Sequence, residues 1–353
     1  MKIIVDLRSL GGNPWSGVPL YTRHIVAALT QHGPKDQWVG FVSGRSIHPP
    51  IIRGIPEVFT DRTSTTQRMI QWRLPGSRWP GVFPTAQALF MPNWNIIPAA
   101  MPMPVVIVVH DCWIWRLPWD GSRRERLWHR AIAIPRLLKS ASRVICVSQS
   151  TQQELLFYCP WLRGKTHVVL SASGAAPAHT CTAACRQSPS PRILIVSDSH
   201  QRKNLGTVLR AIESLPQQWS VDIVGCIGVS KFRNARFHRN VGAAAYDALL
   251  AHAQVVIYDS LYEGFGFPAQ EALERKAPVI ISSSPALVET VGARAHAVVN
   301  PLDWRALAIA ISACRDKSRQ EAAPSPVRTW EDVASETWSV LQEAVDAARR
   351  RAS

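Results

Sequence analysis

Two carboxylates stand on either side of a short apolar bend in the segment YEGFGFPAQEAL. Glu263 and Glu271 flank a stretch that holds two glycines, two phenylalanines and a proline. The run at 255–258 before them is apolar and β-branched, and Pro268 suits the first position of a helix. The segment is therefore predicted to be the end of a strand, a tight loop and the start of a helix, with one acid in the loop and the other in the first helical turns.

The bend between the two acids is suited to holding an anion. Phe265, Gly266 and Phe267 bring backbone N–H groups to the predicted helix N-terminus, which favours negative charge. A carboxylate aimed at that anion would be repelled, so Glu263 and Glu271 are expected to bind neutral hydroxyls on either side of it. A sugar hydroxyl at one end and a ribose at the other describe a nucleotide-sugar.

A pair of cations follows another predicted strand. Arg202 and Lys203 come shortly after the apolar run 192–196, where the pattern predicts the N-terminus of a helix. Two positive charges at the positive end of a helix dipole repel unless an anion lies between them, and a diphosphate is the natural anion. A solvated charge pair on a loop is the alternative.

Two further strand ends in the first half carry candidate residues. Gly17 follows Ser16 at a predicted helix start, where a glycine lets backbone amides approach a phosphate. His110 and Asp111 follow the apolar run 105–109 and can orient hydroxyls or move a proton. The alternatives are a glycine that only makes a turn and a structural His–Asp pair.

Short β-branched runs alternate with helical patterns through both halves of the chain. Strands that are apolar on both faces form parallel sheets covered by helices. The fold class is therefore predicted to be α/β, with two Rossmann-like, doubly wound parallel-sheet domains facing a cleft. In such sheets ligands bind outside the carboxyl ends of the strands, where the candidate residues are expected.

Composition predicts where the chain divides. The segment 173–191 is rich in Ala, Ser, Pro and Cys and has no periodicity, which is typical of a linker. It separates an N-terminal domain at 1–172 from a C-terminal domain at 192–328. The amphipathic pattern at 329–353 predicts a helix that can cross back to the first domain.

Positive charge is concentrated in the first half. Residues 1–170 hold 20 Lys and Arg against 8 Asp and Glu, whereas 171–353 hold 20 against 17. The first half also has ten of the 14 tryptophans. Such a surface suits anionic lipid headgroups or nucleic acid, but no nucleic-acid motif accompanies it. An anionic membrane surface is the expected partner, and a solvated basic face is the alternative.

The densest basic run, at 121–140, is predicted to be one basic amphipathic helix. Leu127, Ile134, Leu137 and Leu138 are available for its apolar side. Such a helix can lie on a membrane or cover a sheet.

The remaining composition points to a reducing compartment. The seven cysteines are odd in number and scattered, which does not suit a disulfide framework. Cys181 and Cys185 with His179 form a weak zinc candidate because no second ligand pair is in sight. The chain opens directly on a strand-like run, so no signal peptide is expected, and the apolar run 101–109 is too short for a bilayer. A cytoplasmic protein, or one on a membrane surface, is expected.

The sequence resembles the retaining glycosyltransferases of family 4, which have the two-Rossmann GT-B fold. YEGFGFPAQEAL matches the E-x7-E signature of that family, in a form typical of its mannosyltransferases. Other matches follow in the expected order over nearly the whole chain: DLRSL, SGVPLYTRHIVAAL, HDCW, SRVICVSQSTQQEL, QRKNL and APVIISSSPALVETVG.

The resemblance implies a role for each candidate residue. Glu263 would contact the donor hexose and Glu271 the ribose hydroxyls. The backbone at Phe265, Gly266 and Phe267 would hold the sugar, and Arg202 with Lys203 the diphosphate. Gly17 would lie under the phosphates from the acceptor-binding N-terminal domain, with His110 and Asp111 near the reacting sugar.

The resemblance also implies the reaction. The family needs no metal and no cofactor, so arginine and lysine neutralise the phosphates. A hexose, with GDP-mannose the favoured donor, would pass with retention of configuration to a lipid-linked or surface polysaccharide acceptor. The protein would then work in the cytoplasm, on the inner face of the cell membrane. A nucleotide-sugar epimerase and a non-catalytic scaffold with the same fold are the alternatives.

Three segments depart from the family pattern. Pro19 and Leu20 replace a common glycine and arginine, and the glycine usual before the cation pair is absent from 196–198. Arg275 and Lys276 stand where small residues and a glycine are usual, and a surface variation is expected there.

Overall fold

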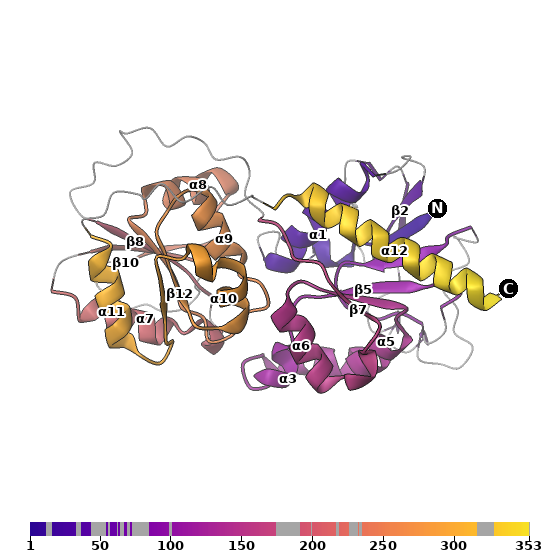
Figure 1. Cartoon of the computed structure of the whole chain (residues 1–353), viewed down its shortest axis with the longest axis horizontal. Coiled ribbons are helices and arrows are strands. Elements are labelled where there is room, and N and C mark those ends of the chain that lie inside the picture. The colour runs from indigo at the N-terminus through magenta and orange to yellow at the C-terminus, as the bar shows by residue number, and fades with distance from the viewer. Residues whose placement is uncertain are drawn as a thin grey trace. The chain divides into compact units, whose positions relative to one another are not determined.

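The computed structural model of the chain describes residues 1–11, 16–32, 37–43, 54–55, 57–61, 63, 67–68, 71–72, 85–98, 101–173, 191–198, 200–216, 219–225, 232, 235–315 and 328–352. The chain divides into two compact units (Figure 1). Unit 1 is Met1–Ala172 with Val327–Ser353, and unit 2 is Ser173–Pro326. Most of the predicted linker and the zinc candidates His179, Cys181 and Cys185 lie outside the described residues.

Unit 1 is built on a seven-stranded parallel sheet in the order β3-β2-β1-β4-β5-β6-β7. Its strands are β1 (Ile3–Asp6), β2 (Trp38–Ser43), β3 (Glu57–Asp61), β4 (Ala88–Met91), β5 (Val105–Val109), β6 (Arg143–Cys146) and β7 (Thr166–Val168). Its helices are η1 (Arg8–Gly11), α1 (Gly17–Leu29), α3 (Trp113–Arg116), α4 (Arg123–Ile132), α5 (Ile134–Ser140), α6 (Gln149–Tyr158), η3 (Pro160–Leu162) and α12 (Trp330–Ala352).

Unit 2 is built on a six-stranded parallel sheet in the order β10-β9-β8-β11-β12-β13. Its strands are β8 (Arg192–Val196), β9 (Ser220–Val224), β10 (Ala235–His238), β11 (Val255–Tyr258), β12 (Val279–Ser282) and β13 (Ala297–Val299). Its helices are η5 (Gln201–Lys203), α7 (Leu205–Glu213), α8 (Ala243–His252), α9 (Phe267–Glu274), α10 (Pro285–Val291), η6 (Gly292–Arg294) and α11 (Trp304–Ala313).

Strands buried on both faces explain why helices cover both sides of each sheet. Every residue of β1, β4, β5, β11 and β12 is buried. Since successive strand residues point to opposite faces, each sheet has an apolar layer on either side. In unit 2, one layer packs against α7 and α11 and the other against α8, α9 and α10. The predicted α/β class with two doubly wound parallel sheets is confirmed.

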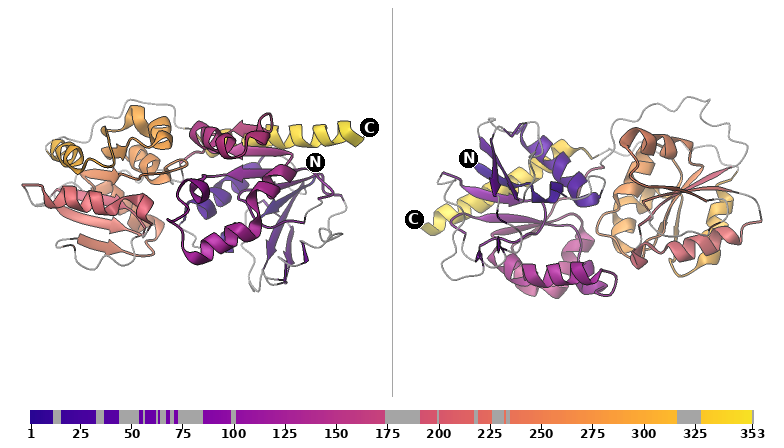
Figure 2. Two further views of the ribbon diagram at one scale, coloured as in Figure 1. Left: turned by 90° about the horizontal axis from the view of Figure 1, so that it is seen from below. Right: turned by 180° about the vertical axis from the view of Figure 1, so that it is seen from behind.

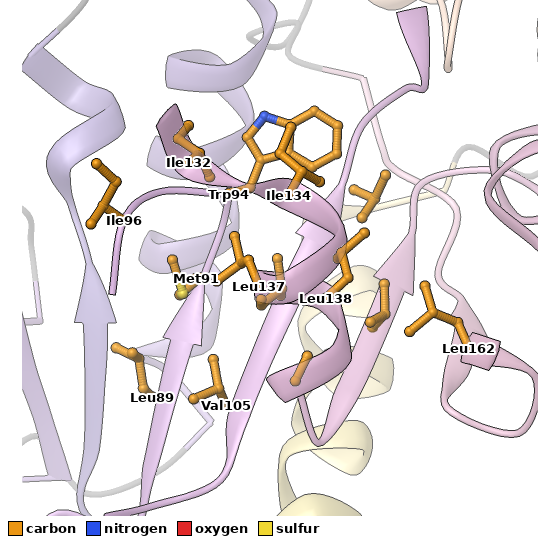
Figure 3. Close-up of a cluster of buried hydrophobic side chains, with 14 of the residues drawn as sticks. Leu89, Met91, Trp94, Ile96, Val105, Ile132, Ile134, Leu137, Leu138 and Leu162 are labelled. Carbon is orange, nitrogen blue, oxygen red and sulfur yellow. The ribbon is translucent and has the colours of Figure 1, made fainter. Parts of the chain in front are cut away.

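The two faces of the unit 1 sheet are covered by different parts of the chain. On one face, α5 inserts Ile134, Leu137 and Leu138 among strand residues such as Met91 (Figure 3). On the other, α12 packs along α1 and over β4, β5 and β6. The contact between the Trp38 and Trp338 rings, 5.7 Å between centroids, belongs to this second face. Figure 2 shows α12 as the long yellow helix of unit 1.

The predicted helix over 121–140 is wrong as a single element. The chain turns at Ala133, whose φ of 52° lies in the left-handed region, so α4 ends and α5 begins there. Ile134, Leu137 and Leu138 face the core, whereas Leu127 is 69% exposed. The four residues therefore do not form one apolar side.

Four described cysteines, Cys112, Cys146, Cys159 and Cys314, are free and buried. Over the described ranges, no helix is both long and apolar enough to cross a bilayer.

Candidate functional site

Strand order places the candidate residues of unit 2 at the switch point of its sheet. β8 is the first strand of the unit, β9 and β10 continue to one side of it, and β11 begins the other side. Loops leaving β8 and β11 therefore run in opposite directions and open a crevice, where ligands of such sheets bind. The two loops are joined directly, because the backbone N–H of Leu261 donates to the carbonyl of Arg202 at 2.7 Å.

A lysine and a glutamate meet in this crevice. Lys203 Nζ donates to Glu263 Oε1 at 2.6 Å and to the Tyr258 hydroxyl at 2.9 Å. The side chains of Lys203 and Glu263 are only 12% and 11% exposed, so water screens the pair weakly. The acid from one predicted strand end and the cation from another are therefore brought into contact.

Neighbouring cations decide the charge of Glu263. Burial alone would raise the pKa of its carboxyl, but Lys203 and Arg202 lower it, and hydrogen bonds from Lys203 and Ser260 add to the effect. The net result is a lowered pKa, so Glu263 is ionised at neutral pH. Burial and the nearby Glu263 raise the pKa of Tyr258 well above 10, so its hydroxyl stays neutral.

The bend after Glu263 depends on Gly266. This residue is the N-cap of α9 with φ of 96°, and a Cβ here would lie 2.4 Å from Leu287 Cδ2. The first helical residue is Phe267, so Pro268 takes the second position and not the first as predicted. The buried Phe265 accepts a hydrogen bond at its carbonyl from Thr290 Oγ1 at 2.8 Å, which anchors the bend to α10.

Glu271 lies in α9 and is buried, with 6% of its surface exposed. Burial raises the pKa of its carboxyl to about 7, against the opposing influence of the Tyr246 hydroxyl and the Arg275 guanidinium. Glu271 therefore changes charge near neutral pH, unlike Glu263. The two acids of the motif have different electrostatic environments, which fits different ligand groups.

The expectation that Arg275 is a surface variation is wrong. Arg275 is buried, forms an ion pair with Asp247 of α8, and donates to the backbone carbonyl of Glu271 at 3.0 Å. A buried guanidinium needs hydrogen-bond acceptors, and Arg275 finds them on both α8 and α9. These contacts hold α9 against α8. Lys276 is exposed as expected, in a left-handed conformation that ends the helix.

The cation pair occupies a short 3-10 helix and not the N-terminus of a longer one. Arg202 and Lys203 belong to η5, and α7 begins only at Leu205, after Asn204 in a left-handed conformation. The Asn204 side-chain amide donates to Asp259 Oδ2 at 2.9 Å and to the Pro301 carbonyl at 2.7 Å. This asparagine ties η5 to the ends of β11 and β13.

Asp259 and Tyr258 are site residues that the sequence analysis did not single out. Asp259 directly follows β11 and is buried, and burial raises the pKa of its carboxyl to about 7. In the described part of the chain its Oδ1 atom has no hydrogen-bond partner. The available signal was position in the sequence. Asp259 comes directly after an apolar strand-like run, as the candidate His110 does.

The other predicted residues belong to unit 1. Gly17 is the exposed first residue of α1, and Ser16 is its N-cap. Residues 12–15 before them lie outside the described residues. The structure therefore places Gly17 at a helix N-terminus as predicted, while its contact with a phosphate stays a prediction.

His110 is held in one orientation at the end of β5. Its Nε2 lies 2.7 Å from the carbonyl of Pro92, and its ring meets Tyr21 edge to face at 4.7 Å. Burial lowers the pKa of His110 to about 4 against the effect of the Pro92 contact, so the ring is neutral at pH 7. Nε2 then donates to Pro92, and Nδ1 keeps its lone pair. Asp111 Oδ1 accepts from the backbone N–H of Trp113 at 3.5 Å.

Unit 1 has an ion pair at its own switch point, between β1 and β4, which the sequence analysis also missed. Arg8 Nη2 contacts Asp6 Oδ2 at 2.7 Å, with both side chains under 5% exposed. Arg8 also donates to the carbonyl of Ile96 at 2.9 Å and lies over the rings of Phe41 and Trp72. This pair joins the loops after β1 and β4.

Metal ligands are not grouped in the described residues. No set of three or more His, Cys, Asp or Glu side chains is placed there to hold an ion. The expected metal independence stays a prediction.

Comparison with protein families gives matches in both units. The profile described as "Glycosyltransferase Family 4" matches residues 24–171, and the profile described as "Glycosyl transferases group 1" matches residues 190–316. The first covers most of unit 1 and the second contains the crevice between β8 and β11.

Two curated relatives are similar to parts of the chain. An O-antigen chain mannosyltransferase B from Escherichia coli is 26% identical over 62% of this chain and 63% of its own length. An MMP α-(1→4)-mannosyltransferase from Mycolicibacterium hassiacum is 33% identical over 28% of this chain and 26% of its own length. The matches thus span less than two thirds of either relative.

A solved structure shares the fold. Sucrose-phosphate synthase from Thermosynechococcus elongatus superposes with a TM-score of 0.72 at 17% identity, covering 98% of this chain and 100% of that chain. Together with the two parallel sheets and the E-x7-E segment at the switch point, the matches show that this chain is a GT-B protein that belongs to glycosyltransferase family 4.

Proposed function

We propose that this chain is a retaining, metal-independent hexosyltransferase. The favoured donor is GDP-mannose, and the acceptor is a lipid-linked or surface polysaccharide. The two curated relatives support mannose as the sugar, because both are mannosyltransferases, one of them for an O-antigen chain. The protein would act in the cytoplasm, on the inner face of the cell membrane.

One observation carries the proposal: Glu263 and Lys203 are in contact at the switch point of the unit 2 sheet, directly before the Gly266 bend. An acid that binds hydroxyls, a cation that binds phosphate and a helix N-terminus that favours anions lie within one crevice. A nucleotide-diphosphate sugar carries both hydroxyls and phosphates, so one ligand of this kind matches all three features.

The residues divide the donor among them. Glu263 is ionised and accepts hydrogen bonds from the hexose, while the backbone at Phe265, Gly266 and Phe267 holds the ring. Arg202 and Lys203 bind the diphosphate and stabilise the charge that grows on it as the sugar leaves. Glu271 accepts from the ribose hydroxyls in its ionised form.

Residues of unit 1 serve the acceptor and the reacting centre. Neutral His110, with Nε2–H held by Pro92, offers Nδ1 as an acceptor for a hydroxyl, and it cannot act as an acid at pH 7. Asp111 is the next residue in the chain, and Gly17 would offer its backbone amide to the phosphates. Retention needs no side-chain nucleophile, because the departing phosphate takes the acceptor proton on the face where the new bond forms.

A donor panel tests the proposal. Purified protein is incubated with GDP-, UDP- and ADP-sugars in buffer with a chelator, and thermal shifts and slow donor hydrolysis are measured. We expect GDP-mannose to give the largest shift. Glu263→Ala should abolish turnover without weakening nucleotide binding, Glu271→Ala should weaken nucleotide binding, and Glu289→Ala, at an exposed position of α10, should change neither.

The outcomes separate the parts of the proposal. If no nucleotide-sugar shifts the melting temperature or is hydrolysed, the transferase function is wrong. Equal loss of nucleotide affinity in the Glu263 and Glu271 variants would refute their division of roles. An inverted anomeric configuration in the product, seen by NMR, would overturn retention.

A further inference from the structure

The outer face of α4 exposes a leucine between two arginines. Arg123, Leu127 and Arg130 are exposed, and their spacing of four and three residues puts them on one side of the helix. Leu127 is 69% exposed, and no part of the proposed transfer reaction uses it. An isolated exposed leucine is ordinary, whereas one centred in a basic stripe is typical of an interaction surface.

Local contacts fix the orientation of α4. A capping box closes its N-terminus, with Ser122 and Glu125 each accepting from the other's backbone N–H. On the inner side, Ile132 is buried and the His129 ring packs edge to face on Trp113 at 5.4 Å. The exposure of Leu127 is therefore a property of a well-anchored helix and does not result from fraying of the helix end.

The turn before α4 adds an aromatic side chain. Trp119 is 65% exposed in a turn closed by the hydrogen bond from the Asp120 N–H to the Leu117 carbonyl at 2.9 Å. Tryptophan prefers the boundary between apolar and aqueous surroundings, since its ring is apolar and its N–H is a donor. Trp119 lies four residues before α4, so the segment that contains Leu127 has a second exposed apolar side chain.

The charges around Leu127 indicate which kind of partner this surface binds. Arg123, Arg124 and Arg130 on α4 are exposed, and Arg136 and Lys139 on α5 are exposed as well. The one acid of α4, Glu125, is engaged in the capping box. A bilayer with anionic headgroups over an apolar interior matches both the arginines and the exposed leucine.

We propose that the α4 surface, defined as Trp119, Arg123, Arg124, Leu127 and Arg130, docks this protein on an anionic phospholipid bilayer. Trp119 and Leu127 enter the headgroup boundary, and the arginines contact lipid phosphates. The inference rests on the proposed function in one respect, since a lipid-linked acceptor brings the enzyme to a bilayer. It differs from a long helix lying flat, because Ile134, Leu137 and Leu138 are buried in the core.

Vesicle binding tests the proposal with the full chain. Sedimentation with vesicles of equal parts phosphatidylglycerol and phosphatidylcholine should carry down the protein, and pure phosphatidylcholine vesicles should not. Leu127→Ser should lower the partition coefficient about tenfold. Arg123→Ser with Arg130→Ser should lower it about 30-fold at low salt.

Matched controls come from the rest of the chain. Ile309 of α11 is 72% exposed and lies four residues after the exposed Arg305, so Ile309→Ser removes a similar side chain from a similar setting in unit 2. Arg349→Ser with Arg351→Ser removes two exposed charges from the end of α12. Both controls should bind vesicles as the unchanged protein does.

Three results would overturn the proposal. The first is failure of the unchanged protein to bind the anionic vesicles. The second is an equal loss in the controls, which would indicate general basicity. The third is a loss in the arginine variant with none in Leu127→Ser, which would indicate electrostatic attraction without insertion of the leucine. Thermal shifts with GDP-mannose, measured on the same samples, report separately on the proposed function.

Discussion

In the described structure, Lys203 Nζ lies 2.6 Å from Glu263 Oε1, with both side chains close to nine-tenths buried. The residue proposed to bind phosphate is thus neutralised by the residue proposed to bind sugar. Any diphosphate that enters must compete with Glu263 for the ammonium group, and a donor that supplies both phosphate and hydroxyls replaces both halves of the pair.

Removing the charge of Glu263 should strengthen the binding of a free nucleoside diphosphate. In Glu263→Gln the ammonium of Lys203 loses its ionic partner, so we expect GDP affinity to rise about fivefold, on the order of 1 kcal/mol. Isothermal titration calorimetry measures it. Guanosine should show no gain because it has no phosphate. An equal gain in Glu289→Gln, which removes an exposed charge from the same unit, would contradict the explanation.

Breaking the pair from the lysine side should destabilise unit 2. Lys203→Met leaves Glu263 buried without its cation, and we expect a loss of about 2–4 kcal/mol in the free energy of unfolding. Adding Glu263→Gln to that variant should recover most of the lost stability, because neither charge of the pair then remains. Urea unfolding of the four proteins gives the coupling energy. Additive losses in the double variant would mean that the two side chains do not interact.

Binding of the nucleotide-sugar should depend on pH through Glu271. Burial raises the pKa of this carboxyl to about 7, and the ionised form accepts from ribose hydroxyls. Affinity for GDP-mannose should therefore rise several-fold between pH 6 and 8, roughly one pKa unit to each side. The donor diphosphate does not titrate in this range. Glu271→Gln should bind more weakly with no such rise, and an unchanged pH profile would rule Glu271 out as its source.

The same carboxyl predicts the pH dependence of stability. The folded pKa of Glu271, about 7, lies above its ordinary value of 4.5, so the folded state holds the proton more tightly. This stabilisation is complete below pH 4.5 and is lost as the pH rises through about 7. The difference in free energy of unfolding between the unchanged protein and Glu271→Gln should change in this window. A constant difference from pH 4 to 8 would contradict the assignment.

Gly266 should tolerate no side chain. Gly266→Ala places a Cβ at φ of 96° and 2.4 Å from Leu287 Cδ2, so we expect unit 2 to lose about 1–3 kcal/mol. Gly206 in α7 is the control, since a Cβ there meets nothing within 4 Å and alanine favours a helix. Gly206→Ala should be neutral or stabilising by up to about 1 kcal/mol. Equal losses in both variants would exclude the local clash.

Periodicity was sufficient to predict the fold class and the strands at 105–109, 192–196 and 255–258, but it did not single out β2, β3 or β10. β-branched runs at 105–109 and 255–258 are buried on both faces, and such strands have few alternatives to a covered parallel sheet. Local pattern was insufficient at 121–140, where the sequence continues as one amphipathic helix while the structure breaks at Ala133. Packing of Leu137 and Leu138 into the core outweighs continuity of the helix there.

By itself, the sequence determined which chemistry is present: two acids around a glycine bend, two cations after another strand, and a basic, Trp-rich first half. Residue types and short spacings carry that information, because strands, bends and helix starts are local. Only the tertiary structure decided that Lys203 neutralises Glu263, that Tyr258 and Asp259 join the site, and that Arg275 is buried against Asp247. These contacts join residues 28 to 60 positions apart, and strand order in the sheet, which local patterns do not encode, sets which loops meet.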